Sequence, residues 1–511
     1  MFAGLLVHAR RRGGRRALVR PPRSLARLCR LWSAKLHPSV RDTETLVMTA
    51  TSENSTMSAP PQDLAELLIL YAYPDTVHAV RILRSINKLW EAAVADWSNR
   101  FIVKAVSSLH NLKFLHRFCQ SLRTLTVYGT TMKRSHVDTL ARLKNVQQLE
   151  FMINQFEEPD VVARLSALSN LRVLDIRRVG GVTSHALGGL CCPNLQVLSL
   201  PHDDVEFWPD GITALVRNTP ALQEANFEFL KIGDSGLKAL SHLPLRSLNL
   251  HQTRVTDCSI VELASHRNVQ ELDLSNCNVA DASVLSLARH CSQSLRLLRL
   301  NGGQRGGCVT DASLQALSQC THLRELHVWA MRAATVAGVS QCITGLGVAA
   351  LAGCAHLHSL CLAACRLGDA DIDALPTFPA LRRLDLSLNK GVTDTSIVRL
   401  RGCPHLEALD IMKCGVSDVG AQVLATYPKL SYLHVGLYKR LDGELSHLFG
   451  CTHVGVAGER ALRDAGLQPS CGGNSYYCQF ERAGYSLRAA FHGERSRVIT
   501  GTGCGALMLY G

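Results

Sequence analysis

One short pattern of apolar residues is repeated through most of this chain. In the copy Val269-Gln-Glu-Leu-Asp-Leu274, apolar residues stand at the first, fourth and sixth positions, and a turn and a short apolar run follow. The copies begin at Leu122, Val146, Leu171, Leu195, Leu222, Leu245, Val269, Leu295, Leu323, Leu357, Leu381, Leu406 and Leu430. Neighbouring copies start 23 to 34 residues apart. A repeat of this length indicates an array of similar structural units.

A single copy is too short to fold alone. In Leu381–Leu386, alternation puts Leu384 and Leu386 on one face of a strand and Arg383 and Asp385 on the other. Stacking the units in parallel pairs each strand with its neighbours and builds one continuous core. We therefore predict an α/β solenoid over residues 122–450, in which a curved parallel β-sheet is covered by outer helices.

Each strand is followed by the same kind of turn. Asn389, Cys277 and Cys414 occupy this turn, where a small side chain can hydrogen-bond to exposed backbone. The motif V-x-D comes next, and its aspartate, Asp394 in one repeat, directly precedes a helical run. That position is where a helix N-cap is expected. A second cysteine, such as Cys403, precedes the next strand.

This combination of motifs resembles the cysteine-containing leucine-rich repeats of F-box/LRR substrate receptors, over about residues 122–450. The resemblance implies a leucine-rich-repeat solenoid that recognises a protein partner on its concave face, with no catalytic activity and no cofactor of its own. In that family an N-terminal F-box binds a Skp-type adaptor of an SCF ubiquitin ligase, and the repeats capture the protein to be modified. We expect such a protein to be cytoplasmic.

Residues 63–121 differ from the repeats and are expected to be helical, including residues 101–121. Residues 63–100 resemble a degenerate F-box, in which Leu67 and Leu68 stand in its opening motif and Ile86 and Trp90 in its closing motif. The resemblance implies that these four residues contact the adaptor. Alternatively, this segment is only a helical cap, because the open end of a solenoid must be shielded.

Residues 1–62 form a basic leader and a linker rich in Ser, Thr and Pro, which we expect to be disordered. Residues 1–47 carry ten Arg and one Lys against two acids, a net charge of +9. The whole chain carries +13, so +4 remains for the other residues. Residues 1–41 contain no acid, and an Arg-rich, acid-free start of this kind fits a mitochondrial transit peptide. Alternatively, translation begins at Met48 or Met57. The first option would favour a mitochondrial scaffold or assembly factor as the function.

The cysteines and the charge argue against several other classes of protein. Eight of the 19 cysteines fall at repeat-fixed positions, where buried free thiols in a reducing compartment are expected. They are Cys192, Cys277, Cys320, Cys354, Cys365, Cys403, Cys414 and Cys451. No C-x-x-C pair indicates a metal site, and no apolar run reaches the roughly 18 residues of a membrane span. The near-neutral repeats do not suggest nucleic-acid binding.

The partner-binding residues should lie on the outward side of the middle strands. We predict that Asp273, Arg299, Asn301, His327 and Trp329 contact the partner, with an exposed Trp329 as the main contact. Alternatively, Trp329 packs beneath the insertion that follows it. Asp273, Asp385 and Asp410 recur on successive strands and are expected to form a solvated ridge rather than a catalytic or metal site. Residues 451–511 should form a C-terminal cap with β structure.

Overall fold

The computed structural model describes residues 8–9, 17–18, 100–103, 123–201, 209–302, 309–329, 343–439, 445–447, 454–471 and 477–482. The chain divides into two compact units, residues 1–157 and residues 158–511. Residues 63–99, which resemble an F-box, lie outside the described residues. The same is true of most of the basic leader, in which only β1 (His8–Ala9) and β2 (Ala17–Leu18) form a short antiparallel pair.

The first unit contains three parallel strands in register. These are β3 (Arg100–Val103), β4 (Thr124–Met132) and β5 (Gln148–Phe156), with α6 (Arg134–Leu140) between the last two. The prediction of a helix from residue 101 is therefore wrong for residues 101–103. Phe101-Ile-Val103 is a run of aromatic and β-branched residues, which favours a strand where an adjacent edge offers backbone partners.

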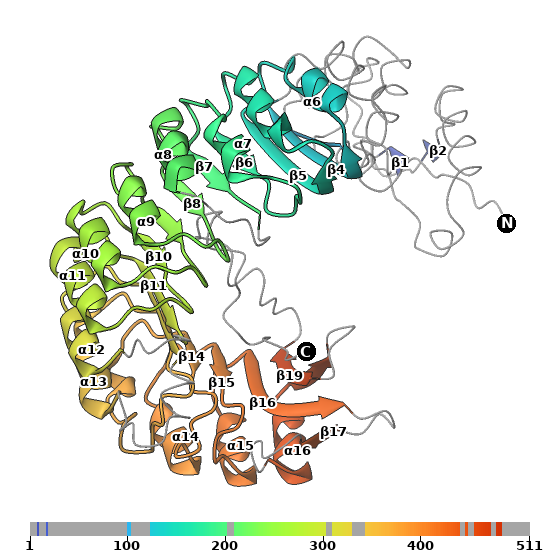
Figure 1. The fold of residues 1–511 in the computed structure, drawn as a ribbon. Helices are drawn as coiled ribbons and strands as arrows, with labels where there is room; N and C mark the ends of the chain where they lie inside the picture. The colour runs from blue at the N-terminus through green and yellow to red at the C-terminus, as the bar shows by residue number, and fades with distance from the viewer. Residues whose placement is uncertain are drawn as a thin grey trace. The chain divides into compact units, whose positions relative to one another are not determined.

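The second unit contains one uninterrupted series of parallel strands (Figure 1). The strands are β6 (Val173–Asp175), β7 (Val197–Ser199), β8 (Glu224–Asn226), β9 (Ser247–Asn249), β10 (Glu271–Asp273), β11 (Leu297–Asn301), β12 (Glu325–Trp329), β13 (Ser359–Cys361), β14 (Arg383–Asp385), β15 (Ala408–Asp410) and β16 (Tyr432–Lys439). Each pairs in parallel with the next, which confirms the predicted solenoid sheet.

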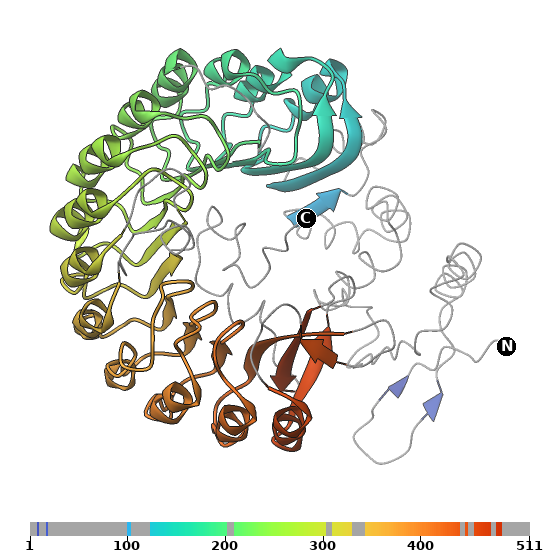
Figure 2. The same ribbon diagram turned by 60° about the horizontal axis from the view of Figure 1, so that its bottom comes forward.

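Helices connect these strands and lie on the outer side of the curved sheet within this unit (Figures 1 and 2). They are η2 (Pro159–Ala167), α7 (Ser184–Gly188), α8 (Pro209–Asn218), α9 (Asp234–Leu240), α10 (Asp257–Ser265), α11 (Asp281–Cys291), α12 (Asp311–Leu317), α13 (Gly345–Ala350), η3 (Leu351–Gly353), η4 (Leu375–Thr377), α14 (Asp394–Leu400) and α15 (Asp418–Leu424). Most are one or two turns long, so packing against the sheet must supply their stability.

The core of the second unit is a stack of leucines. Leu272, Leu298, Leu326 and Leu360 occupy paired positions on successive strands, and all four are buried. Burial of one leucine side chain contributes about 1.5–3 kcal/mol relative to exposure. The stack therefore explains why the apolar frame recurs in every repeat.

Aspartates at the helix starts, and Asp369 in the corresponding turn, join each repeat to the next. Asp234 in α9 accepts hydrogen bonds from Thr256 N (2.8 Å), Thr256 Oγ1 (2.7 Å) and Ser259 Oγ in the following repeat. Asp394 contacts Ser417 in the same way. We call this series the carboxylate ladder, and its described members are Asp234, Asp257, Asp281, Asp311, Asp369, Asp394 and Asp418.

The prediction that these aspartates are N-caps is therefore wrong by one residue. The helix α14 begins at Asp394, and the preceding Thr393 is the N-cap, whose hydroxyl accepts from Thr395 N. Ser417 and Thr310 cap α15 and α12 in the same manner. The aspartate is thereby left available to bond the adjacent repeat, which a reading of one repeat in isolation could not reveal.

The repeat-fixed cysteines are buried free thiols, as predicted, except that Cys451 lies outside the described residues. Cys277 Sγ donates to the Leu250 carbonyl of the preceding repeat at 2.9 Å, and Asn389 Nδ2 makes the equivalent bond to Leu362 at 2.8 Å. Burial raises the pKa of the Cys277 and Cys320 thiols to about 12. These cysteines act as small core residues.

The carboxyl-terminal end of the second unit changes to antiparallel pairing. The strand β16 pairs antiparallel with β17 (Leu445–His447) and with β19 (Tyr477–Arg482), and β19 pairs with β18 (Leu467–Cys471). The helix α16 (Val456–Asp464) packs beside α15. β structure is thus present in the expected C-terminal cap. The remainder of that segment, residues 483–511, lies outside the described residues.

Candidate protein-recognition face

The candidate site is the sheet face opposite the helices, which we call the strand face. Strand register brings the five predicted partner-binding residues together on β10, β11 and β12. Asp273, Arg299 and His327 occupy paired positions on these strands, and Asn301 pairs with Trp329 one step further along. The predicted grouping therefore follows from the register.

The predicted exposure of these residues is wrong for three of the five. Asp273 is 0 % exposed, Arg299 1 % and His327 0 %. Arg299 Nη1 lies 3.3 Å from Asp273 Oδ2. Burial alone would raise the pKa of Asp273, but the Arg299 guanidinium and the Ser275 hydrogen bond lower it below its ordinary value. A buried charge is tolerated when it is paired and hydrogen-bonded.

The recurring acids on the strand face also have a local structural role. Asp273 Oδ1 accepts the backbone N–H of Ser275 at 2.9 Å, and Asp410 accepts that of Met412 at 2.9 Å. Asn249 bonds His251 N in the same way. Such turns satisfy backbone groups where each strand ends. Of the predicted solvated ridge, Asp273 and Asp410 are buried and Asp385 is half-buried, so the ridge is not solvated.

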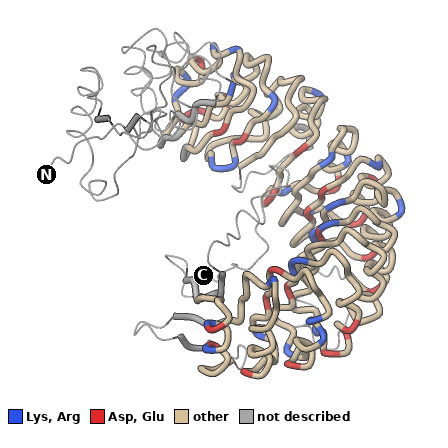
Figure 3. The backbone as a smooth tube through the Cα atoms, turned by 180° about the vertical axis from the view of Figure 1, so that it is seen from behind, with Lys and Arg blue, Asp and Glu red and all other residues tan. Residues whose placement is uncertain are grey.

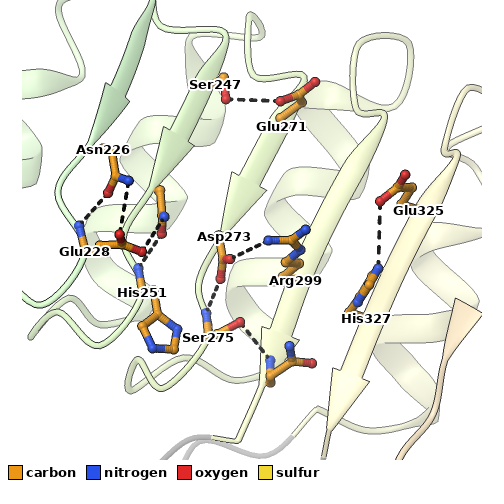
Figure 4. A network of polar contacts seen from close by, with 12 residues as sticks. Asn226, Glu228, Ser247, His251, Glu271, Asp273, Ser275, Arg299, Glu325 and His327 are labelled. Carbon is orange, nitrogen blue, oxygen red and sulfur yellow. Dashed lines mark hydrogen bonds and ion pairs between the residues drawn. The ribbon is translucent and has the colours of Figure 1, made fainter. Parts of the chain in front are cut away.

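Polar contacts continue along the strand face towards β8 (Figure 4). Glu228 accepts from Asn226 Nδ2 at 3.3 Å and from Asn249 Nδ2 at 3.0 Å. The His251 ring lies edge-on to Phe229, with centroids 5.1 Å apart. Asn226, Glu228, Asn249 and His251 are all buried. Their sequence positions are outward-facing in the repeat frame, but nothing in the frame reveals that they bond one another.

Towards β14, charged side chains are held by longer-range contacts. Arg383 Nη2 donates to Glu325 Oε1 at 2.9 Å, although the two residues are 58 positions apart. His327 Nε2 lies 3.8 Å from Glu325 Oε2. At β16, His434 Nδ1 lies 2.9 Å from Asp410 Oδ2. Burial alone would lower the pKa of His434, but Asp410 raises it above its ordinary value.

Trp329 and Asn301 are uncharged and less buried than Asp273, Arg299 and His327. Both are half-buried, so Trp329 is less exposed than predicted. Within the described part of the chain, Asn301 Oδ1 and Trp329 Nε1 are buried atoms without a hydrogen-bond partner. The first atom is an acceptor and the second is a donor. Two neighbouring strand ends thus carry unused hydrogen-bonding capacity of opposite kinds.

Among the residues that the structure describes, no group of three or more His, Cys, Asp or Glu side chains could hold a metal ion. In the same residues, no helix combines the length and apolar character that crossing a membrane requires. The predicted adaptor-binding residues Leu67, Leu68, Ile86 and Trp90 lie outside the described residues.

The family model described as "Leucine Rich repeat" matches residues 265–288 and 402–425. No curated protein matches the chain. An internalin from Listeria monocytogenes is similar in structure, with 19 % identity and a TM-score of 0.46, covering 76 % of this chain and 93 % of that one. The Rad7–Elc1 complex of yeast is similar with 18 % identity and a TM-score of 0.45, covering 73 % and 86 %. The chain folds as a leucine-rich-repeat solenoid.

Proposed function

We propose that this leucine-rich-repeat protein is a non-catalytic recognition protein that binds a protein partner on the strand face at β11 and β12. The observation that carries the proposal is the pair Asn301 and Trp329. They lie at matched positions on neighbouring strands, and one offers an acceptor where the other offers a donor. A peptide group of a partner offers one donor and one acceptor, and it would complement both atoms once the half-buried side chains of Asn301 and Trp329 turn outward.

The ion-paired residues around this pair support the proposal. Asp273, Arg299 and Glu325 are buried in ion pairs, which fix their side chains before any partner arrives. A preformed surface loses less conformational entropy on binding than a mobile one. A buried polar atom left without a partner costs about 1–3 kcal/mol, so supplying one would favour binding.

The site is tested with the full chain and a photo-crosslinking amino acid placed at Asn301 or, as a control, at Leu346. Leu346 is 75 % exposed on the helix side, in α13. We expect a protein to be crosslinked from position 301 and not from position 346. The affinity of that protein is then measured by calorimetry for Trp329→Ala and for Leu346→Ala.

Trp329→Ala should weaken binding by about 1 kcal/mol or more, which is roughly fivefold or more, with little change in the melting temperature. Leu346→Ala should leave the affinity unchanged. Unaltered affinity of the tryptophan variant would exclude Trp329 as a contact. A large drop in its melting temperature would instead favour the alternative that Trp329 is a packing residue.

We further propose that the protein is a cytoplasmic substrate receptor of an SCF-type ubiquitin ligase. The resemblance of residues 63–100 to an F-box supports this assignment, with Leu67, Leu68, Ile86 and Trp90 as the adaptor contacts. The test is co-purification with a Skp-type adaptor. We expect binding that is lost in Leu67→Asp and in Trp90→Ala. If the adaptor does not bind at micromolar concentrations, the function is that of a scaffold or assembly factor.

A further inference from the structure

A second row of residues runs along the edge of the sheet at which the strands begin. Backbone hydrogen bonds link one residue per repeat. Gln270 N donates to Arg246 O (2.8 Å), Arg296 N to Gln270 O (2.7 Å), Arg324 N to Arg296 O (2.8 Å) and His358 N to Arg324 O (2.9 Å). We call this row, with the loops that lead into it (residues 241–246, 265–270, 292–296, 318–324 and 353–358), the amino-terminal edge.

The amino-terminal edge carries charge of one sign. Its five loops contain no Asp or Glu and four arginines, all exposed, at positions 246, 267, 296 and 324. Among the described residues, Arg246, Arg267 and Arg296 form no ion pair. The acids that begin two of the adjoining strands, Glu271 and Glu325, contact Ser247 and Arg383 instead. Both charges are common elsewhere along this unit (Figure 3), so the acid-free edge is a local feature.

Histidines extend the same edge and show that side chains of neighbouring loops meet. The rings of His242 and His266 lie edge-to-face with centroids 6.2 Å apart. The rings of His322 and His356 are stacked at 6.1 Å with an interplanar angle of 5°. All four rings are exposed. Side chains of neighbouring loops therefore meet at both ends of the amino-terminal edge.

We propose that the amino-terminal edge from β9 to β12 is a second binding surface, which takes a polypeptide segment rich in Glu and Asp. Neighbouring strands are about 4.8 Å apart, so along the edge Arg246 stands roughly 10 Å from Arg296, and Arg296 roughly 5 Å from Arg324. Carboxylates on one side of an extended chain recur about every 7 Å. Guanidinium groups bind carboxylates with two parallel hydrogen bonds.

The chemistry of the edge favours a polypeptide over a nucleic acid. Proteins that bind single-stranded nucleic acids stack bases on aromatic side chains. The five loops contain no Phe, Tyr or Trp. The edge is also separate from the strand face, because its residues precede the strands while Asn301 and Trp329 end them. The two surfaces can therefore be tested independently.

The test uses the full chain and a fluorescent peptide of alternating Glu and Ser, about ten residues long, which spans the edge from β9 to β12 when extended. Binding is followed by fluorescence anisotropy at low salt. The edge variant is Arg246→Gln/Arg296→Gln. The matched control is Arg254→Gln/Lys390→Gln, which removes two exposed cations from loops that follow β9 and β14. The same peptide with Gln in place of Glu is the probe control.

We expect the acidic peptide to bind, and the edge variant to bind it about three- to tenfold more weakly, as the loss of two solvent-exposed ion pairs predicts. Binding should weaken as salt is raised. The control variant should bind the acidic peptide as tightly as the parent does, and the neutral peptide should not bind. Equal affinity of the edge variant and the control variant for the acidic peptide would overturn the proposal, as would no binding of that peptide to the parent. Tighter binding of oligo(dT) than of the peptide would assign the edge to nucleic acid and equally overturn it.

Discussion

Individual carboxylates determine how one repeat is attached to the next. Asp369 accepts hydrogen bonds from Thr393 N (2.9 Å), Thr393 Oγ1 (2.6 Å) and Ser396 Oγ in the following repeat. Burial alone would raise the pKa of Asp369, but the hydrogen bonds from Ser396 and Thr393 lower it below its ordinary value. The carboxylate of Asp369, which itself lies in a turn, thus accepts donors at the start of the next helix, α14.

Replacing Asp369 tests this role. Asp369→Ala should lower the free energy of unfolding by about 1–3 kcal/mol, because donors at the start of α14 lose their acceptor. Asp373→Ala is the control in the same repeat, since Asp373 is exposed and, among the described residues, pairs with the surface residue Arg399. It should change the stability by less than about 1 kcal/mol. Urea unfolding measures the free energy of unfolding of both variants. An equal loss in the two variants would show that the carboxylate ladder does not stabilise the contact between repeats.

The effect of Asp369 should also depend on pH. Because the folded-state pKa is lowered, its contribution to stability is present above the unfolded-state pKa of about 3.9 and is lost as the pH falls through the folded value. The difference in unfolding free energy between the parent and Asp369→Asn should therefore shrink as the pH falls below about 4. A difference that stays constant from pH 7 to pH 3 would show that the charge of Asp369 has no part in it.

Among the helices, the third position decides how closely two repeats approach. Serine stands there in α14 as Ser396, and its hydroxyl donates to Asp369. Glycine stands there in α15, and Gly420 N donates to Asp394 Oδ1 at 3.0 Å. A Cβ at Gly420 would lie 2.4 Å from Asp394 Oδ1 and 2.6 Å from Val416 Cγ1. The glycine is required by the close approach of these two groups.

Gly420→Ala should therefore destabilise the protein by about 1–3 kcal/mol, as overpacking does elsewhere. Gly368→Ala is the control, because its Cβ would meet nothing closer than 3.7 Å. That variant should stay within about 0.5 kcal/mol of the parent. The melting temperatures of both variants provide the measurement. If Gly420→Ala has the same melting temperature as the parent, the repeats are not packed as closely as described.

The repeat frame predicted the strands and the buried leucines of the second unit because both follow from local alternation. It also placed the small residues in the turns correctly, since Cys277 and Asn389 contact backbone of the preceding repeat. Helix starts were misplaced by one residue, because the partner of each aspartate lies in the next repeat. The strand β3 was missed because its pairing with β4 lies outside the repeated frame.

Across the second unit, the polar side chains of the strand face form a network of hydrogen bonds and ion pairs, because the strand register brings them together. Sequence alone indicated which residues share this face, such as Arg299 and Asp273, but not that they are buried or paired. Whether a polar side chain is exposed depends on contacts between residues 20 to 60 positions apart. Glu325 and Arg383 are the longest of these links. The predicted binding residues therefore divide into two groups. Asp273, Arg299 and His327 are buried, and Asn301 and Trp329 are half-buried.

The most direct test of this register is a double-mutant cycle on Asp273→Asn and Arg299→Met, with unfolding free energies measured in urea. If β10 and β11 are adjacent strands of one sheet, the two residues meet, and the single changes should not be additive. We expect a coupling free energy of about 1 kcal/mol or more. Additivity within about 0.3–0.5 kcal/mol would show that these residues do not interact, and would contradict the strand face described above.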